Sequence, residues 1–544
     1  MLPAKNEFNS NMHLYSQSNQ FKTGGWGCRN TKRGDMYILI TLILVLLHLL
    51  LLPVYLYLTW HHKYWRKRGL TTAKPLTLLG TYPGLLTRKS NLVQDVQSVY
   101  NKYKGKHRAV GVFVTRKPQI LVLDPQLAHE VLVENFRCYK DSLTSSYMQH
   151  AKWDKYAKRN PFWAAGVTWR RLRTEAQAGL SANRLKQGYA IWEQSGRKLT
   201  NYMAEQVNVH NNILETRDLC FRYTADVMCD FIWGIDAGTL TSNEPGQPNM
   251  VQEMASKWTS YAFYMISIFM ASIIAPFGRL LLRLRFYPKD TDEFFSKLTK
   301  ESIELRLKTG YEVERIDYLS HLLKLREEKN ATHDDLVGHA LTVMLDGYDT
   351  TGSALMHALY YLSEYPAAQQ KLRSEFLNNA LKTKTLDFDK LCDLPYLEQV
   401  IYESLRLSSL IPQYTKVCTH PTNIQLNAFK RVEVEQGMTI MIPNYQFHHD
   451  PKYFPEPEVF KPERFDNAEH HNLVRQGILL PFSDGPRICM GIRLALLTLK
   501  SALFHIISNY QVVRSKKKIN TAGDSGFGVV LQGDINLEYR RFLQ

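Results

Sequence analysis

Helical spacing of apolar residues dominates the chain from about residue 125 onward, with polar residues at the intervening positions. Before this stretch, 109–115 and 119–123 alternate or run apolar around a Lys-Pro turn, which predicts a hairpin of two strands. Shorter strand signals follow near Ile424 and after Val512. We find no internal repeat and no low-complexity tract in the sequence. The pattern therefore predicts a mainly α fold with small β-sheets, organised as one large domain.

One apolar segment is uniform instead of periodic, because Met36 to Thr59 carries no charged residue. A helix of that length spans about 36 Å, which is enough to cross a bilayer with some tilt. The cluster WHHKYWRKR follows at 60–68 and favours the cytoplasm for what comes after it. A cleavable signal peptide is the alternative, but its apolar core would be shorter and end in small residues. We interpret 36–59 as a transmembrane signal-anchor and 60–74 as a basic linker.

The residues that precede the anchor, 1–35, are polar and rich in Asn and Gly. Arg29, Lys32 and Arg33 lie close to the apolar run and compete with the downstream cluster for the cytoplasmic side. We hypothesise that translation starts at Met36 and that 1–35 is an extension that is either not translated or disordered. Peptides from 1–35, detected by mass spectrometry in the mature protein, would exclude the first option.

Composition narrows the class of protein. The chain has 544 residues, 44% of them hydrophobic, which is ample material for a core. Its seven cysteines are scattered without paired spacing, so a disulfide framework is not expected and a reducing, cytosol-facing location fits better. The net charge of +17 is compatible with nucleic-acid binding, but no binding motif accompanies it. An anionic membrane surface and an acidic redox partner explain the charge better, with Arg170, Arg171, Lys500 and 514–518 as candidate contributors.

The loop around Cys489 carries the strongest chemical signal, and the chain reads PFSDGPRICMG over 481–491. Its glycines allow backbone dihedrals and close approaches that a Cβ would forbid. A leucine-rich helical run starts near Gly491, so the positive end of its dipole favours a thiolate at Cys489. A lone cysteine is usually only a small buried hydrophobe. This one sits in the setting that a single-cysteine iron ligand requires.

A long apolar helix is predicted from Thr332 to about Glu364, with the sequence THDD as a capping box at its start. Its middle reads DGYDTT over 346–351, and these residues are poor helix formers that compete for backbone hydrogen bonds. A solvent-facing polar patch is the simple explanation. Such a local violation inside an apolar helix is also typical of a functional site.

Two weaker patterns gain meaning from their position. Glu403 and Arg406 are three residues apart on a predicted helix and can pair, and Arg464 belongs to a Pro-Glu-Arg-Phe sequence shortly before the cysteine loop. Trp169 and Arg173 lie one helical turn apart, so an indole N–H and a guanidinium can reach the same anionic group.

The order Phe-x-x-Gly-x-Arg-x-Cys-x-Gly resembles the haem-ligand loop of the cytochrome P450 family, and the other motifs follow the family's order over 75–544. The resemblance implies a haem-thiolate catalytic domain over these residues, with haem b bound through Cys489. It implies haem-binding roles for Phe482 and Gly491, and contacts to the haem propionates from Trp169, Arg173 and Arg487. Lys416 stands where many relatives place a propionate-binding Arg, and loses that residue's bidentate fork.

The same resemblance assigns the middle of the long helix to oxygen chemistry. Thr350 would steady iron-bound dioxygen and Asp349 would help to relay protons to it. Asp346 departs from the family, which has Ala or Gly there, and could hydrogen-bond Thr350, bring in water or narrow the pocket. Glu403, Arg406 and Arg464 would form a buried network that fixes the cysteine loop.

The resemblance further implies an insect microsomal monooxygenase in the endoplasmic reticulum membrane, single-pass, with its catalytic domain facing the cytosol. It would insert one oxygen atom from O2 into a lipophilic xenobiotic, hormone or lipid, with electrons from NADPH–cytochrome P450 reductase and cytochrome b5 as an optional further partner. A rearranging enzyme that consumes peroxides is one alternative, disfavoured by Thr350. A non-catalytic protein that binds haem and ligand is another, kept open by Asp346. The uncharged run 261–276 is either a core helix or a segment dipping into the bilayer beside the substrate entrance, and we favour the latter.

Overall fold

The structure is a computed structural model that describes residues 27–87, 90–148, 154–241, 251–257, 287–309, 315–380, 386–515 and 534–542. The chain divides into two compact units, Met1–Thr59 and Trp60–Gln544, which are described separately. The run 261–276 and most of the polar extension 1–35 lie outside the described residues.

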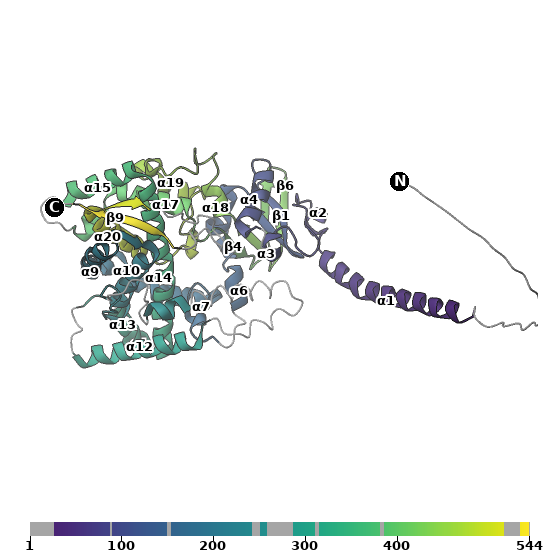
Figure 1. Ribbon diagram of the computed structural model, residues 1–544, viewed down its shortest axis with the longest axis horizontal. Coiled ribbons are helices and arrows are strands. Elements are labelled where there is room, and N and C mark those ends of the chain that lie inside the picture. Colours follow the sequence, from purple (N-terminus) through teal and green to yellow (C-terminus); the bar gives the residue numbers. More distant parts are fainter. Residues whose placement is uncertain are drawn as a thin grey trace, which may run out of the picture. The chain divides into compact units, whose positions relative to one another are not determined.

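In the first unit the described residues form one helix, α1 (Gly27–Thr59), drawn in purple in Figure 1. Its segment Met36–Thr59 has a mean hydropathy of 2.7, and none of it is buried inside protein. Within the described part of the chain, this is the one helix that is long and apolar enough to cross a membrane. The helix begins upstream of the predicted span because the helical backbone continues through the polar residues before Met36.

The second unit is mostly helical, as the spacing of apolar residues predicts. Its longer helices are α4 (Leu92–Tyr103), α7 (Gly166–Gly179), α9 (Ala190–Val209), α10 (Thr216–Trp233), α12 (Lys289–Thr309), α13 (Tyr318–Lys329), α14 (His333–Glu364), α15 (Pro366–Ala380), α17 (Pro395–Leu407) and α20 (Ile492–Asn509). Its short helices are α2 (Tyr64–Lys67), α3 (Gly84–Thr87), α5 (Pro125–His129), α6 (Leu143–Met148), α8 (Ala182–Gln187), α16 (Phe388–Cys392), α18 (Asn444–His448) and α19 (Glu469–Arg475), with the 3₁₀ turns η5 (Pro462–Ala468) and η6 (Gly485–Arg487).

Within the described residues, the second unit also contains three small sheets. The largest has the order β1 (Ala109–Val114), β2 (Lys117–Val122), β7 (Thr439–Ile442) and β4 (Tyr414–Val417). The second has the order β3 (Ile213–Glu215), β9 (Asn536–Arg541) and β8 (Tyr510–Arg514), and the third pairs β5 (Thr422–Asn427) with β6 (Lys430–Val434). The predicted hairpin is confirmed, because β1 and β2 are antiparallel with Val114 opposite Lys117.

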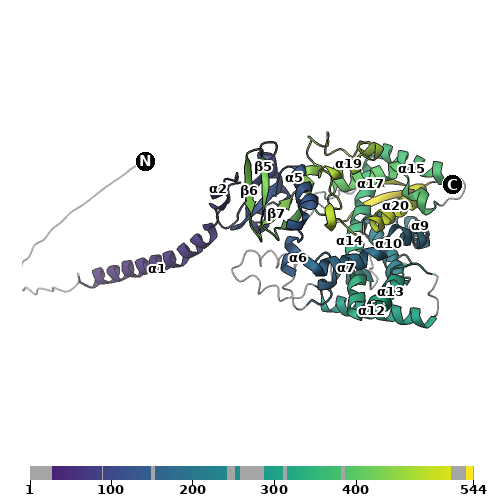
Figure 2. The same cartoon turned by 180° about the vertical axis from the view of Figure 1, so that it is seen from behind.

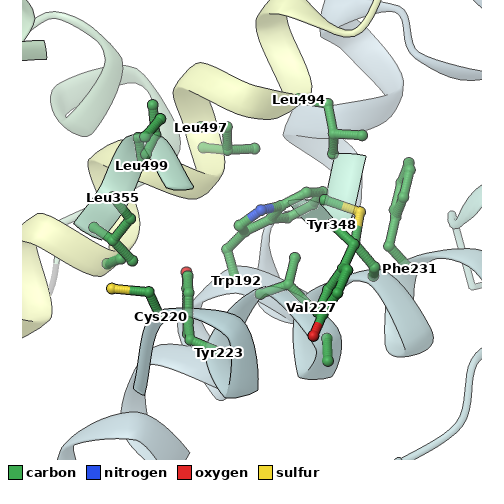
Figure 3. Close-up of a cluster of buried hydrophobic side chains, with 14 of the residues drawn as sticks. Trp192, Cys220, Tyr223, Val227, Phe231, Tyr348, Leu355, Leu494, Leu497 and Leu499 are labelled. Carbon is green, nitrogen blue, oxygen red and sulfur yellow. The ribbon is translucent and has the colours of Figure 1, made fainter. Parts of the chain in front are cut away.

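The helices α9, α10, α14 and α20 group together, away from β1, β6 and α4 (Figures 1 and 2). Figure 3 shows the core between them, where Trp192, Tyr223, Phe231 and Leu497 point toward one another. The Trp192 indole donates to the Thr498 hydroxyl over 2.9 Å, so its one polar atom is satisfied inside this apolar cluster. This packing holds α14, which carries Asp349 and Thr350, and α20, which begins directly after the cysteine loop.

The start of α14 confirms the predicted capping box. The Thr332 side chain accepts a hydrogen bond from the Asp335 backbone N–H, and the Asp335 side chain accepts one from the Thr332 backbone N–H. From this cap the helix runs without interruption to Glu364, through the polar stretch in its middle.

Candidate functional site

The loop before α20 has a backbone that only glycine permits at one position. Gly485 has φ of +71°, and a Cβ there would lie 2.1 Å from the Leu132 carbonyl oxygen. The backbone N–H of Cys489 donates to the Phe482 carbonyl over 2.9 Å and closes the loop. Gly491 is the N-cap residue of α20, so the helix begins at Ile492, three residues after Cys489.

The Cys489 thiol differs from the other cysteines in its access to solvent. Of the six cysteines whose side chains are described, Cys489 is exposed, whereas Cys220, Cys229 and Cys418 are buried and the other two are half-buried. Many protein atoms still surround the Cys489 sulfur at longer range, and this burial raises the pKa of the thiol. A hydrogen bond from the Gly491 backbone N–H and the charge of Arg173 act in the opposite direction. Cys489 is thus accessible to solvent, and the start of α20 offsets part of the cost that burial imposes on its thiolate.

A buried ionic network lies behind this loop, as the sequence predicts. Neither Glu403 nor Arg406 is exposed to solvent. The Glu403 carboxylate accepts hydrogen bonds from Arg406 Nε (2.7 Å) and Nη2 (2.9 Å), from Arg464 Nε (2.9 Å) and from the Lys461 backbone N–H (2.9 Å). Because the carboxylate and the guanidiniums are paired and hydrogen-bonded, the network meets the condition under which charges survive burial.

His448 connects this network to the cysteine loop, and sequence reasoning missed it. Arg406 Nη1 donates to the His448 carbonyl over 2.7 Å, and the His448 Nε2 accepts from the Leu480 backbone N–H over 2.9 Å. Burial holds the pKa of His448 well below its usual value, so the ring is neutral and its nitrogen can accept. Leu480 directly precedes the loop, so the His448 imidazole connects the network to the residue from which the loop starts. Nothing in the local sequence around His448 pointed to this role, because both contacts join residues far apart in the chain.

Cations and aromatic rings gather on another side of the loop. Trp169 and Arg173 lie on α7, and Arg173 Nη2 donates to the Ile488 carbonyl over 2.7 Å. The Arg487 guanidinium lies 4.4 Å from the centre of the Trp169 ring. The Phe136 ring packs 5.7 Å from Trp169, and Lys416 Nζ lies 5.4 Å from Phe136. The structure thus brings all four residues with predicted propionate contacts into one cluster beside Cys489.

Arg487 is already occupied within this cluster. Its guanidinium donates to the carbonyls of Lys140 (2.7 Å) and Ala164 (3.1 Å) and to the Asp141 carboxylate (2.9 Å). These bonds tie the cysteine loop to the segment that leads into α7. The structure therefore gives Arg487 a loop-fixing position beside its predicted role.

Lys416, in contrast to Arg487, is buried without a partner in the part of the chain that the structure describes. It is 4% exposed, and within the described residues its ammonium has no hydrogen-bond or ion-pair partner. Burial lowers the pKa of Lys416 to about 7, the charge of Arg487 acts in the same direction, and Asp141 opposes both. A buried cation of this kind requires an anion, so the donor set fits a carboxylate-bearing ligand at the edge of the loop.

The middle of α14 presents a solvent-accessible stretch between buried ones. Thr350 is exposed and both Asp346 and Asp349 are half-buried, whereas Leu345 and Thr351 are buried. The Thr350 hydroxyl donates to the backbone carbonyl of Asp346 over 2.6 Å. The carboxylate of Asp346, which was one candidate partner for Thr350, instead accepts from the Asn160 amide over 3.1 Å. The first contact has the four-residue spacing of a threonine that bonds back to its own helix, whereas the second joins residues far apart in the chain.

The two aspartates of this stretch have different surroundings. Burial raises the pKa of Asp346 to about 7, and the charge of Asp346 is one of the causes that raise the pKa of the Cys489 thiol. Burial also raises the pKa of Asp349, against the opposing charge of Arg217. Asp349 lies on the wall of a pocket of about 650 Å³, together with Arg217 and Asp218 of α10.

The family model for cytochrome P450 matches residues 71–534 of the chain. The chain belongs to the cytochrome P450 family. It is 76% identical over 517 residues to probable cytochrome P450 309a2 of Drosophila melanogaster, across 95% of this chain and 96% of that protein. It is 48% identical to probable cytochrome P450 309a1 across 93% and 99%, and 34% identical to probable cytochrome P450 28d1 across 89% and 96%, both from the same organism.

Membership of this family settles the general chemistry. The protein is an insect cytochrome P450 monooxygenase whose cofactor is haem, with an iron bound by a cysteine thiolate. The described residues fit that cofactor, since an accessible thiol, the glycine-dependent loop and an unpaired buried lysine adjoin one another. The single apolar helix α1 fits a single-pass membrane anchor.

Proposed function

We propose that Cys489 is the iron ligand, and that the enzyme inserts one oxygen atom from O2 into a lipophilic small molecule. Electrons would come from NADPH–cytochrome P450 reductase, with cytochrome b5 as an optional further partner. The observation that carries the ligand assignment is the pairing of solvent access at the Cys489 sulfur with a hydrogen bond from the Gly491 backbone N–H. When bound, the haem supplies the activation of dioxygen, and a thiolate ligand favours cleavage of its O–O bond.

The cationic cluster would orient the cofactor through its carboxylates. Lys416 contributes a buried ammonium that lacks an anion within the described residues, and Trp169 contributes an indole N–H without a hydrogen-bond partner there. Arg173 would add further N–H donors from its guanidinium, of which one already donates to the Ile488 carbonyl. Arg487 and Phe482 would act mainly on the loop, through the bonds that hold its backbone.

Protons would reach the reacting oxygen through the accessible stretch of α14. The raised pKa of Asp349 means that its carboxyl holds a proton more readily than a surface aspartate, and its pocket offers contact with solvent. The Thr350 hydroxyl would have to release its bond to the Asp346 carbonyl before it could donate to a molecule held next to the haem. Retention of Thr350 disfavours the alternative of a rearranging enzyme that needs no reductase.

We assign the catalytic domain to the cytosolic face of the endoplasmic reticulum membrane, on the support of α1 and the basic cluster after it. Arg170 and Arg171 are exposed on α7 and remain candidates for an acidic redox partner. The prediction that Lys500 contributes to such a surface was wrong. Its side chain is buried and its ammonium donates to the Cys392 carbonyl and the Glu398 carboxylate.

The test is the spectrum of the reduced carbonmonoxy complex of wild type and Cys489→Ser, with Cys392→Ser as a matched control. We expect the band of a thiolate-bound haem in wild type and the control, and its loss in Cys489→Ser. An unchanged spectrum in Cys489→Ser would reject the assignment. Product formed per NADPH with purified reductase then separates a monooxygenase from a non-catalytic haem protein, the alternative that Asp346 keeps open.

A further inference from the structure

A histidine pair on α19 lies against α17, the helix that also carries Glu403 and Arg406. His470 and His471 each offer a ring nitrogen, and Glu398 of α17 offers a carboxylate oxygen. These three ligand atoms all lie within 4.8 Å of one another. Figures 1 and 2 both show α19 beside α17. Imidazole and carboxylate together form a donor set that suits zinc and related divalent transition metals.

His470 supplies an independent observation that a ligand is expected there. The residue is 3% exposed, and neither ring nitrogen makes a hydrogen bond within the described residues. Buried polar atoms of this kind are rare and require an explanation. The Nε2 atom lies 3.2 Å from Glu398 Oε1, but the two are not aligned as a hydrogen bond. Two ligands on a tetrahedral zinc ion lie about 3.3 Å apart, as bonds of about 2.0–2.1 Å require.

The surroundings hold both groups in position. The Tyr402 ring stacks on His470 with centroids 4.1 Å apart and fixes its orientation. Lys500 Nζ lies 3.2 Å from Glu398 Oε2 and so holds one oxygen, while the other faces His470. Metal-binding carboxylates usually have such a supporting partner. The pKa of Glu398 is lowered to about 2, since burial is outweighed by His470 and Lys500, and the carboxylate is ionised at neutral pH.

The third ligand is free to adjust. His471 is exposed, so rotation of its side chain costs little, and burial together with His470 lowers its pKa. A neutral imidazole is the form that binds a metal.

We propose that Glu398, His470 and His471 form a zinc-class divalent metal site that links α17 to α19. The linkage would stabilise the segment that leads from the Glu403 network to the cysteine loop. The site is separate from the haem, and its occupation does not depend on the monooxygenase reaction.

The experiment counts zinc on the full-length holoenzyme. The protein is treated with EDTA, exchanged into chelator-free buffer and dialysed against zinc chloride, and bound zinc is measured per protein by mass spectrometry. We expect wild type to hold one zinc more than His471→Ala, with an affinity loss of at least about tenfold in the variant. His107→Ala removes an exposed histidine elsewhere and should match wild type.

Thermal unfolding provides the second measurement. Zinc should raise the melting temperature of wild type and His107→Ala and leave that of His471→Ala unchanged. Equal zinc uptake by wild type and His471→Ala, or no uptake by wild type, would overturn the proposal. Since neither measurement involves turnover or the haem spectrum, the result stands whether or not Cys489 is the iron ligand.

Discussion

Replacing Glu403 by glutamine removes the single carboxylate that two guanidiniums share. Oε2 of Glu403 accepts from Arg406 Nε over 2.7 Å, and Oε1 accepts from Arg406 Nη2, Arg464 Nε and the Lys461 N–H over 2.9 Å each. In Glu403→Gln an amide NH2 group replaces one of these oxygens, so its N–H groups face the N–H donors that the oxygen had accepted from. Arg406, which has no exposed surface, also loses its counter-ion.

The expected cost follows from burial. Removing one partner of a buried ion pair destabilises a protein by about 3–5 kcal/mol, because the remaining charge is left uncompensated. The matched control is Lys371→Ala, which breaks the pair between Lys371 and Glu463 next to Arg464. Those side chains are 52% and 44% exposed, so the control should cost about 0–1 kcal/mol. A gap of about 4 kcal/mol corresponds to about a thousandfold in the folding equilibrium.

The assay is urea unfolding of the haem-loaded protein, followed by circular dichroism and by the haem absorption band. We expect a large shift of the midpoint for Glu403→Gln, with the haem band lost at lower urea than the helical signal, since the network supports the cysteine loop through His448. The reasoning is refuted if Glu403→Gln unfolds within about 1 kcal/mol of wild type, or if Lys371→Ala loses as much.

Three further outcomes follow from the site. Haem affinity of wild type should fall as pH rises from about 7 toward 9, by up to about tenfold per unit, because Lys416 has a pKa of about 7 and must take up a proton to pair with a haem carboxylate. Haem transfer to an acceptor globin should show this slope in wild type, and an equal slope in Lys416→Met would contradict the assignment. Gly485→Ala should lose at least about 2 kcal/mol and most of its haem, because φ is +71° and the new Cβ meets the Leu132 carbonyl. Gly437→Ala has a similar φ but no atom within 4 Å, so calorimetry should show a much smaller loss there. Finally, Asp346→Asn should raise the haem reduction potential by the order of tens of millivolts at pH 8. It should have little effect at pH 6, where the pKa of about 7 leaves the native carboxyl protonated; equal shifts at both pH values in redox titration would argue against an ionised Asp346.

Local patterns predicted the local structure well. The capping box at Thr332 and the hairpin of β1 and β2 are confirmed, because short-range hydrogen bonds and turn chemistry determine both. The spacing of Glu403 and Arg406 placed their pair on one helix face, and the buried network with Arg464 is present in the structure.

Long-range contacts were beyond such patterns. The bond from Asn160 to Asp346 joins residues far apart in the chain, and only the packing of their segments brings them together. The same holds for His448, whose nitrogen accepts from Leu480, and for Lys500, which composition placed on the surface and packing buried. Exposure of a charged side chain cannot be read from its helix alone, because long side chains cover apolar surface while their ends find partners.

The path from Glu403 through Arg406 and His448 to Leu480 also bears on recombination between related enzymes. The four residues come from three separate stretches of the chain. A chimaera whose crossover lies between His448 and Leu480 would therefore take the histidine from one parent and Leu480 from the other. Crossovers placed before α17 would inherit the whole assembly from one parent and should retain the cofactor. Crossovers between α17 and α18 would combine Glu403 and Arg406 from one parent with His448 and Leu480 from the other. Among the hybrids of a library, these should be the first to lose bound haem.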